Sequence, residues 1–357
     1  MTVPRVPVRD DLAALTPYGA PQLDVAVRLN TNETPTPPPA EVMEQIGKRV
    51  AALALNRYPD RRATALRVAL GERAGLGCEQ VWAANGSNEV LSQLFQAYGG
   101  PARRLLLFSP GYSAHPLLAR VTLTPVVTAP LDDEFRLTPD AAAATVAAHD
   151  PDLVCVASPN NPTGLPVDLD AVRALHDAGR ALVIVDEAYV EFGAPSALAL
   201  LAELPRLVVT RTFSKAWRMA GVRLGYLYGP AWVIDDLRKV RLPYHLDALT
   251  QEAGLVACER ADEVTAHVAE VAGERERLRA GLAALPGVEV FDSAANFLLF
   301  RTAVGDLFDR LLARGVLVRD FSHVPRLEGC LRVTVGSPEE NDAFLAALAA
   351  ALPGGSS

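Results

Sequence analysis

LVCVAS (153–158), ALVIVDEA (181–188) and RLVVTRT (206–212) are the stretches that decide the fold of this chain. Each contains a continuous apolar run, which is typical of a parallel strand covered on both faces. RLLLF (104–108) precedes them, GYLYG (225–229) follows, and helical stretches separate the runs. This alternation predicts an α/β architecture with a mostly parallel, doubly wound sheet.

The regions outside this alternation predict an arm and a second, smaller unit. Residues 1–40 are rich in proline, so they cannot form a regular helix or a central strand. They are either disordered or laid across another surface. We expect a large domain at 41–248 and a smaller α+β domain at 249–357, completed by part of the arm. Two helices, or one kinked helix, are expected at about 250–285.

Composition excludes several classes of protein. The chain has 357 residues, half of them apolar, and a net charge of -8, so we expect no nucleic-acid surface. Four scattered cysteines without a CxxC pair indicate reduced thiols, and six histidines show no metal-binding spacing. The chain begins without a signal peptide, and no apolar run approaches the ~20 residues that span a bilayer. We expect a soluble cytoplasmic protein without a metal.

Lys215 is the most informative single residue, within RTFSKAWRMAGVRLGY (211–226). A desolvated lysine forms a Schiff base with an aldehyde. Thr212 and Ser214 offer hydroxyl groups, and Arg223 offers a planar fork of donors suited to a phosphate. Pyridoxal phosphate carries both an aldehyde and a phosphate, so it is the cofactor that this segment favours. The alternative is an ordinary surface lysine.

Polar residues also follow the neighbouring strands, at the edge where open α/β sheets bind ligands. Asp186 ends one strand and could keep a pyridine nitrogen protonated, although a helix cap is an alternative. Asn161, in the turn SPNNPTG (158–164), could donate to the phenolate oxygen of the cofactor, and Tyr189 could share that contact. The turn is otherwise a simple loop after a strand.

Two further segments complete the predicted cofactor site. Gly86, Ser87 and Asn88 open a predicted helix, whose free N–H groups could hold the phosphate, although simple helix capping would also explain them. Tyr112 follows another strand and could stack on the ring of the cofactor, or it could be an exposed tyrosine.

Two arginines in the second unit require partners. Arg332 lies in an apolar strand and Arg319 ends another, and a buried arginine is costly unless it is paired. An internal carboxylate such as Asp320 or Glu328 could be the partner. An anionic group of the substrate, held by two hydrogen bonds, is the alternative.

Taken in order along the chain, the motifs resemble those of the fold type I pyridoxal-phosphate aminotransferases. They are GSNE (86–89), PGYS (110–113), SPNNPTG (158–164), VDEAY (185–189), TFSKAWRMAGVRLG (212–225) and LRVTVGSPEEN (331–341). Four stretches resemble the histidinol-phosphate aminotransferase family in particular. They are TPYGAPQLDVAVRLNTNETP (16–35), NRYPD (56–60), VRLPYHL (240–246) and GCLRVTVGSPEEN (329–341). The resemblance runs from about Leu12 to Leu348.

This resemblance implies a role for each matching residue. Lys215 would be the Schiff-base lysine and later the proton shuttle, while Asp186 would hold the pyridinium. Asn161 and Tyr189 would contact the ring oxygen, and Tyr112 would stack on the ring. The residues implied around the phosphate are Gly86, Ser87, Thr212, Ser214, Arg223 and, from the neighbouring subunit of a homodimer, Tyr58. The residues implied in the substrate pocket are Tyr18, Asn32, Asn88, Tyr244, Arg319 and Arg332.

The implied reaction transfers an amino group between L-histidinol phosphate and 2-oxoglutarate in histidine biosynthesis. An aromatic amino-acid aminotransferase acting on phenylalanine is the main alternative, and a phosphothreonine decarboxylase shares the scaffold. A cofactor-binding regulator without turnover is a further alternative, but residues 1–40 are too short to supply a DNA-binding domain. Trp217, Arg218 and Thr34 depart from the commonest family pattern, and none of them is expected to touch a reacting atom.

Overall fold

The central sheet has seven strands in the order β2-β8-β7-β6-β5-β3-β4. Their bounds are β2 Val81–Ala84, β3 Leu105–Ser109, β4 Val126–Pro130, β5 Leu153–Ala157, β6 Leu182–Asp186, β7 Leu207–Thr212 and β8 Gly225–Tyr228. This architecture is that of a computed structural model, which describes residues 6–13, 15 and 19–353. The apolar runs predict five of these strands, and the short β2 and the partly exposed edge strand β4 were not predicted.

Strands β3 to β7 pair in parallel, as the apolar runs predict. Strand β8 is different, because it pairs antiparallel with both β7 and β2. The expectation that GYLYG forms a parallel strand was therefore wrong. Residues 213–224 join β7 to β8 without an α-helix, whereas a parallel connection usually runs through one.

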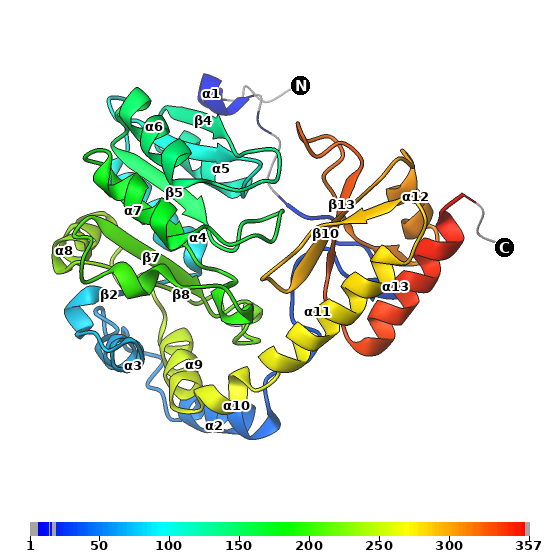
Figure 1. Ribbon diagram of the computed structural model, residues 1–357. Helices are drawn as coiled ribbons and strands as arrows, with labels where there is room; N and C mark the ends of the chain where they lie inside the picture. The colour runs from blue at the N-terminus through cyan, green and yellow to red at the C-terminus, as the bar shows by residue number, and fades with distance from the viewer. Residues whose placement is uncertain (1–5, 14, 16–18, 354–357) are drawn as a thin grey trace.

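Helices cover both faces of the large sheet (Figure 1), which confirms the doubly wound α/β fold. Alternate residues of β6 point to opposite sides, so Ile184 packs in one apolar cluster and Val183 in the other. Helices on the Ile184 side are α4 Ser87–Tyr98, α5 Ala114–Val121 and α8 Ala231–Val240. Those on the Val183 side include α6 Pro139–His149 and α7 Leu169–Asp177.

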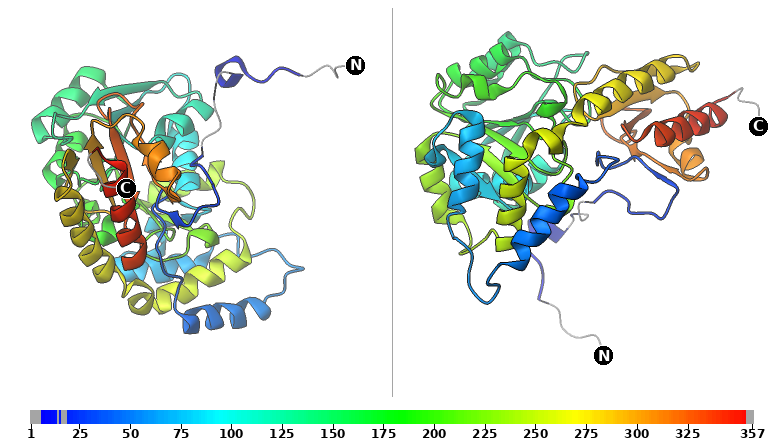
Figure 2. Two further views of the ribbon diagram at one scale, coloured as in Figure 1. Left: turned by 90° about the vertical axis from the view of Figure 1, so that its right-hand side faces the viewer. Right: turned by 90° about the horizontal axis from the view of Figure 1, so that it is seen from below.

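Three helices lead from the large sheet to the smaller unit (Figures 1 and 2). They are α9 Ala248–Glu259, α10 Ala261–Thr265 and α11 Val268–Ala283. The sequence predicted two helices or one kinked helix here. The break before α10 falls at Arg260, whose φ of -113° is not helical.

The smaller unit contains a four-stranded antiparallel sheet in the order β12-β13-β10-β9. Its strands are β9 Val288–Val290, β10 Phe297–Thr302, β12 Arg319–Asp320 and β13 Cys330–Thr334. The accompanying helices, besides α11, are α12 Leu307–Leu312 and α13 Pro338–Ala351. This arrangement confirms the predicted α+β character.

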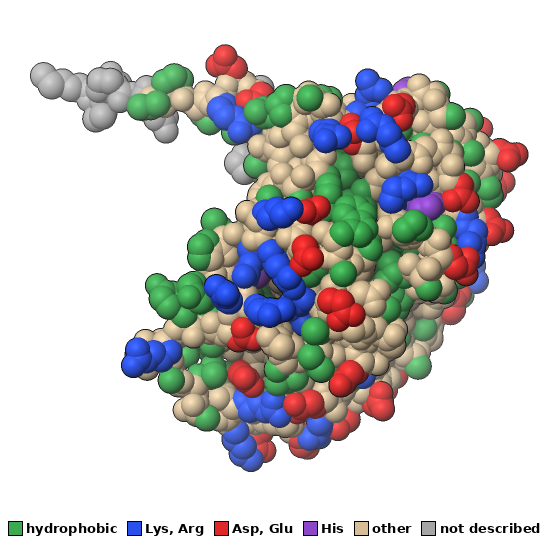
Figure 3. Space-filling model, turned by 90° about the vertical axis from the view of Figure 1, so that its left-hand side faces the viewer, with side chains coloured by type: hydrophobic (Ala, Val, Ile, Leu, Met, Phe, Trp, Pro, Cys, Tyr) green, Lys and Arg blue, Asp and Glu red, His purple; other side chains and the backbone are tan. Residues whose placement is uncertain are grey.

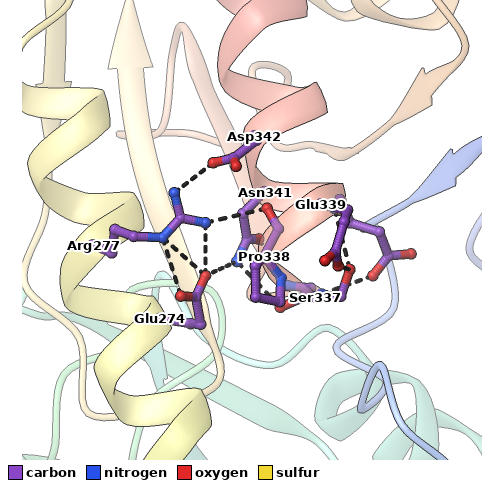
Figure 4. A network of polar contacts seen from close by, with 9 residues as sticks. Glu274, Arg277, Ser337, Pro338, Glu339, Asn341 and Asp342 are labelled. Carbon is purple, nitrogen blue, oxygen red and sulfur yellow. Dashed lines mark hydrogen bonds and ion pairs between the residues drawn. The ribbon is translucent and has the colours of Figure 1, made fainter.

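Polar contacts hold α11 against the start of α13 (Figure 4). Arg277 pairs with Glu274 at 2.8 Å on its own helix and with Asp342 on α13. Asn341 donates to the same Glu274 carboxylate at 2.9 Å. A capping box between Ser337 and Glu340 starts α13, so the helix begins where this network needs it.

The amino-terminal segment contacts both units. Arg9, just before the helical turn α1 Asp10–Ala13, donates to the carbonyl oxygen of Val121 on α5 at 3.4 Å, whereas the two-residue strand β1 Val27–Arg28 pairs in parallel with β11 Val316–Leu317 of the smaller unit. The segment continues along β13, because Thr334 N donates to Leu29 O at 2.8 Å. The chain then enters the large unit through α2 Ala40–Ala51 and α3 Thr64–Ala74.

Four short 3-10 helices complete the described secondary structure: η1 Cys78–Gln80, η2 Val190–Phe192, η3 Ala197–Leu200 and η4 Ala220–Val222. Within residues 6–13, 15 and 19–353, no helix is long and apolar enough to cross a bilayer. The same residues contain no cluster of three or more His, Cys, Asp or Glu side chains that could hold a metal ion.

Candidate active site

A cavity of about 640 Å³ lies at the carboxyl ends of β5, β6 and β7, and Arg319 of the smaller unit closes part of it. Most of the predicted site residues line its wall. They are Ser87, Asn88, Tyr112, Asn161, Asp186, Tyr189, Thr212, Ser214, Lys215, Arg223 and Arg319. These residues come from nine separate segments, and the strand ends of the sheet bring them together.

Lys215 lies on the loop after β7, and its amine points to the amino-terminal segment. Its Nζ donates a hydrogen bond to the carbonyl oxygen of Thr31 at 2.8 Å. Burial lowers the pKa of Lys215 to about 7, and the charges of Arg332 and Arg223 act in the same direction. Glu33 acts in the opposite direction. A large fraction of this amine is therefore neutral near pH 7, as a nucleophilic lysine requires.

Asp186 is buried at the end of β6, with 3% of its surface exposed. Thr210 donates to its Oδ1 at 3.2 Å, and His115 Nε2 lies 3.1 Å from its Oδ2. Burial by itself lowers the pKa of His115, but the Cys155 sulfur and the Asp186 carboxylate raise it to about 10. A charged imidazolium therefore balances the buried carboxylate.

His115 is a site residue that the sequence analysis missed. It lies on α5, two positions after the quoted motif PGYS (110–113) and three positions after Tyr112. No spacing signal links it to Asp186, which is 71 positions away in the chain. The only available signal was its place directly after a strand end that already carried a predicted site residue.

The residues that the sequence predicts around a phosphate meet where α4 begins. Gly86 precedes this helix with a φ of +82°, and a Cβ there would lie 2.7 Å from Arg223 Nη2. Ser214 accepts hydrogen bonds from Thr212 Oγ1 at 3.0 Å and from Arg223 Nη1 at 3.3 Å. A glycine-opened helix start beside two hydroxyl groups and a guanidinium fits a phosphate group.

Asn161 connects the large sheet to the smaller unit. Its Oδ1 accepts a hydrogen bond from Arg332 Nη1, and Arg332 Nη2 donates to Asn30 O at 2.8 Å. The hydrogen bonds to Asn161 and Asn30 satisfy two donor groups of the Arg332 guanidinium within the protein.

Arg332 also lies next to the second arginine of the predicted substrate pocket. Arg319 and Arg332 face each other in register on the antiparallel strands β12 and β13. Arg319 lines the cavity and donates to Gly19 O at 3.3 Å. Arg319 therefore borders the cavity directly, while Arg332 lies buried beside it and contacts the lining residue Asn161.

The amino-terminal segment contributes to the same region. Asn32 is buried, and its Nδ2 donates to the hydroxyl group of Tyr189 at 3.0 Å. Thr31 and Glu33 line the cavity. The sequence analysis assigned no role to these two residues, although they belong to the quoted stretch LNTNETP (29–35).

Five described residues of the predicted site are not among those that line the cavity. Gly86, Asn32 and Arg332 lie next to lining residues or donate hydrogen bonds to them, whereas Tyr58 and Tyr244 lie at the surface. Tyr58 and Tyr244 are 79% and 40% exposed, and their rings stack on each other at a centroid distance of 4.3 Å. The described residues that line the cavity do not include either of them. Tyr18, also predicted for the substrate pocket, lies outside the described residues.

Comparisons with known sequences cover nearly the whole chain. Residues 24–348 match the family model for aminotransferase class I and II. The chain is 50% identical to a histidinol-phosphate aminotransferase of Thermobifida fusca, over 96% of this chain and 95% of that protein. It is 48% identical to one of Corynebacterium diphtheriae, over 97% of this chain and 96% of that protein.

Solved structures of similar fold cover most of the chain. A histidinol-phosphate aminotransferase of Sinorhizobium meliloti in complex with pyridoxal-5'-phosphate has a TM-score of 0.83 at 25% identity, covering 91% of this chain and 90% of that one. An L-threonine-O-3-phosphate decarboxylase of Porphyromonas gingivalis has a TM-score of 0.79 at 23% identity, covering 90% of this chain and 98% of that one. The second likeness concerns the fold alone.

Proposed function

We propose that this chain transfers the amino group of L-histidinol phosphate to 2-oxoglutarate. The chain belongs to the class I and II aminotransferases and, within them, to the histidinol-phosphate aminotransferase family. It is a pyridoxal-phosphate-dependent transaminase of histidine biosynthesis. The observation that carries the choice of substrate is the adjacent pair Arg319 and Arg332 beside the cavity.

The residues of the cavity fit pyridoxal phosphate at each of its functional groups. When bound, this cofactor supplies an aldehyde and an electron-withdrawing pyridinium ring. We assign its phosphate to the start of α4 together with Ser214 and Arg223, and its ring nitrogen to Asp186. His115 holds the Asp186 carboxylate in place, and Lys215 is the residue for covalent attachment.

Lys215 also has the properties of the group that moves the proton. Its pKa of about 7 allows its amine to accept a proton from the substrate Cα and return one near neutral pH. The Thr31 carbonyl accepts a hydrogen bond from Nζ and so orients the amine. We assign to Lys215 the roles of general base and general acid on this ground.

The arginine pair distinguishes a phosphate ester from an apolar side chain. A phosphate offers three oxygens to two guanidinium groups, whereas phenylalanine offers only its α-carboxylate. Glutamate, formed in the second half of the reaction, has two carboxylates that can use the same arginines. The pair therefore suits both substrates of the proposed reaction.

The donor comparison tests this assignment. With 2-oxoglutarate as acceptor, kcat/KM for L-histidinol phosphate should exceed that for L-phenylalanine by about tenfold or more, since hydrogen bonds to charged groups contribute roughly 1.5–3 kcal/mol. The variant Arg319→Gln should lower kcat/KM for histidinol phosphate while changing that for phenylalanine much less. Equal or faster turnover of phenylalanine by the wild type would contradict the proposed donor.

We further infer a homodimer in which Tyr58 of one chain reaches the cofactor phosphate of the other. Tyr58 and Tyr244 form an exposed stacked pair, and Leu55 and Leu242 are 64% and 72% exposed. The face in Figure 3 carries protruding hydrophobic side chains beside a group of Lys and Arg side chains. Large exposed apolar side chains that gather in this way are typical of an interface between subunits.

Mixed dimers test the crossing of Tyr58. Chains with Lys215→Ala and chains with Tyr58→Ala should each be inactive or weak as pure dimers. Unfolding and refolding an equal mixture should restore about a quarter of the wild-type rate, because half of the dimers then contain one intact site. No recovery in verified mixed dimers would place the action of Tyr58 within its own chain.

We place this activity in the cytoplasm. The four cysteines are free thiols rather than disulfides in the structure, and free cysteines suit a reducing compartment.

A further inference from the structure

A second cavity, of about 310 Å³, lies on the other side of β7 from the cofactor cavity. Its walls include Arg211, Glu191 and Trp217. Each of them is within two positions of a residue that lines the cofactor cavity, namely Thr212, Tyr189 and Lys215 respectively. The two cavities are therefore lined by neighbouring residues of the same stretches of chain, including the loop that carries Lys215.

Two polar atoms in this wall have no hydrogen-bonding partner among the described residues. One is the indole Nε1 of Trp217, a residue only 4% exposed, and the other is Oε1 of Glu191. Burial raises the pKa of Glu191 to about 7, and the nearby Arg211 and Trp217 N–H act against that rise. The Trp217 N–H therefore lies near the Glu191 carboxylate, although neither Nε1 nor Oε1 forms a hydrogen bond of good geometry within the described residues.

The charges around this cavity are also incompletely balanced. Arg211 is neutralised by Glu187, at 2.9 Å, and it also donates to Ser196. Arg73 forms no ion pair within the described part of the chain, and its guanidinium lies 5.4 Å from the centre of the Trp217 ring. Within the described part of the chain, Arg73 is therefore the cation of this wall without an ion pair, and Glu191 is the acid without one.

Aromatic rings supply the rest of the wall. Tyr226 and Tyr228 line the cavity together with Trp217, and their rings meet edge to face at 5.4 Å. Flat apolar walls favour a planar ring in the ligand. The volume is at the lower end of small-molecule sites, which begin at roughly 300 Å³, so it suits a molecule of amino-acid size.

We propose that this cavity is a regulatory site for a free amino acid with a planar ring. The ligand carboxylate binds Arg73, its ammonium group binds the Glu191 carboxylate, and its ring packs against the aromatic walls. Trp217 belongs to the Lys215 loop, so occupancy changes turnover at the cofactor cavity without competing for it. This inference goes beyond the proposed function and does not depend on which amino donor the enzyme uses.

Binding of L-phenylalanine to the holoenzyme, measured by calorimetry, tests the site. The wild type should show a binding component that Glu191→Gln and Arg73→Gln each weaken about tenfold or more, because each removes one charged contact. Phenethylamine lacks the carboxylate and 3-phenylpropionate lacks the ammonium group, so both should bind more weakly than L-phenylalanine. Turnover without added ligand should remain within about twofold in both variants.

Tryptophan fluorescence provides a readout that does not involve catalysis. The change caused by L-phenylalanine should disappear in Trp217→Phe and persist in the control Trp232→Phe, since Trp232 lies at the surface on α8. Arg73→Gln, at an exposed position of α3, tests the same site if a buried substitution prevents folding. Binding and fluorescence that match the wild type in Arg73→Gln and in the folded buried variants would overturn the proposal, since the amino acid would then bind in the cofactor cavity alone.

Discussion

Asp186 and Glu187 are consecutive buried acids with opposite surroundings. Asp186 is 3% exposed, contacts His115 and faces the cofactor cavity. Glu187 is fully buried and accepts hydrogen bonds from Arg211 at 2.9 Å and from Ser196 at 2.8 Å, on the other side of the sheet. Successive residues of a strand point to opposite faces, so one step along the chain separates a catalytic environment from a structural one.

The neighbouring strand β7 repeats this division. Thr210 bonds Asp186 and Thr212 lines the cofactor cavity, whereas Arg211 between them pairs with Glu187. Changes on the cavity side should therefore affect turnover, and changes on the opposite side should affect stability. The predictions below test this division.

The largest effect is expected for Lys215→Ala. Among the described residues that line the cavity, Lys215 carries the only side-chain amine, so its loss removes both covalent attachment and the proton transfer, and general acid–base catalysis alone contributes up to about 10⁴-fold. Steady-state turnover should fall by at least that factor. Lys239→Ala is the matched control, because Lys239 is an exposed lysine paired with Asp236, and it should retain full activity.

Asp186→Asn should have the next largest effect on turnover. It leaves the charged His115 without its carboxylate, and breaking a buried pair costs roughly 3–5 kcal/mol. Even the lower value, expressed in the transition state, slows the reaction by about 100-fold. Stopped-flow kinetics and titration with pyridoxal phosphate would measure the rate and the cofactor affinity. An unchanged kcat would contradict the assignment of Asp186 to the cavity side.

Glu187→Gln should give the opposite result. It leaves Arg211 without its carboxylate, so the free energy of unfolding should fall by about 3–5 kcal/mol. Urea denaturation measures this loss, while kcat of the folded enzyme should stay within about twofold. Replacing both partners, with Glu187→Met and Arg211→Met, should recover much of the stability. A large loss of kcat in a stable Glu187→Gln enzyme would contradict the division between a cavity side that determines turnover and an opposite side that determines stability.

The smallest effect concerns the pH dependence of cofactor capture. Because the pKa of Lys215 is lowered to about 7, its amine becomes neutral as the pH rises through 7, and capture of pyridoxal phosphate should speed up over that range. The Arg332 charge helps to lower this pKa, so Arg332→Gln should move the midpoint upward. Glu187→Gln should leave the midpoint unchanged. A midpoint near that of free lysine, about 10, would show that burial does not act on this amine.

Most of the site that lies on the sheet could be predicted from the sequence. The apolar runs indicate strands, and the polar residues directly after them lie at the same sheet edge, which brings Asn161, Asp186 and Thr212 together. This reasoning depends only on local periodicity and on the parallel direction of the strands. This reasoning did not predict that β8 is antiparallel to its neighbours, because a short run of apolar residues indicates a buried strand but not its direction.

Contacts between distant segments could not be predicted. His115 reaches Asp186 from 71 positions away, and the Thr31 carbonyl reaches Lys215 from 184 positions away. Neither pair has a spacing that a local pattern would reveal. Tyr244 was expected in the substrate pocket, but in its own chain it stacks on Tyr58 outside the cavity.

The sequence by itself determined the α/β class, the family and the candidate residues of the site, because these depend on residue type and on repeats of a few positions. Only the tertiary structure decided on which side of the sheet each side chain lies. It placed Asp186 beside His115 and Glu187 beside Arg211, and it lowered the pKa of Lys215 by burial. Burial and pairing arise from packing between segments far apart in the chain, so no local pattern contains them.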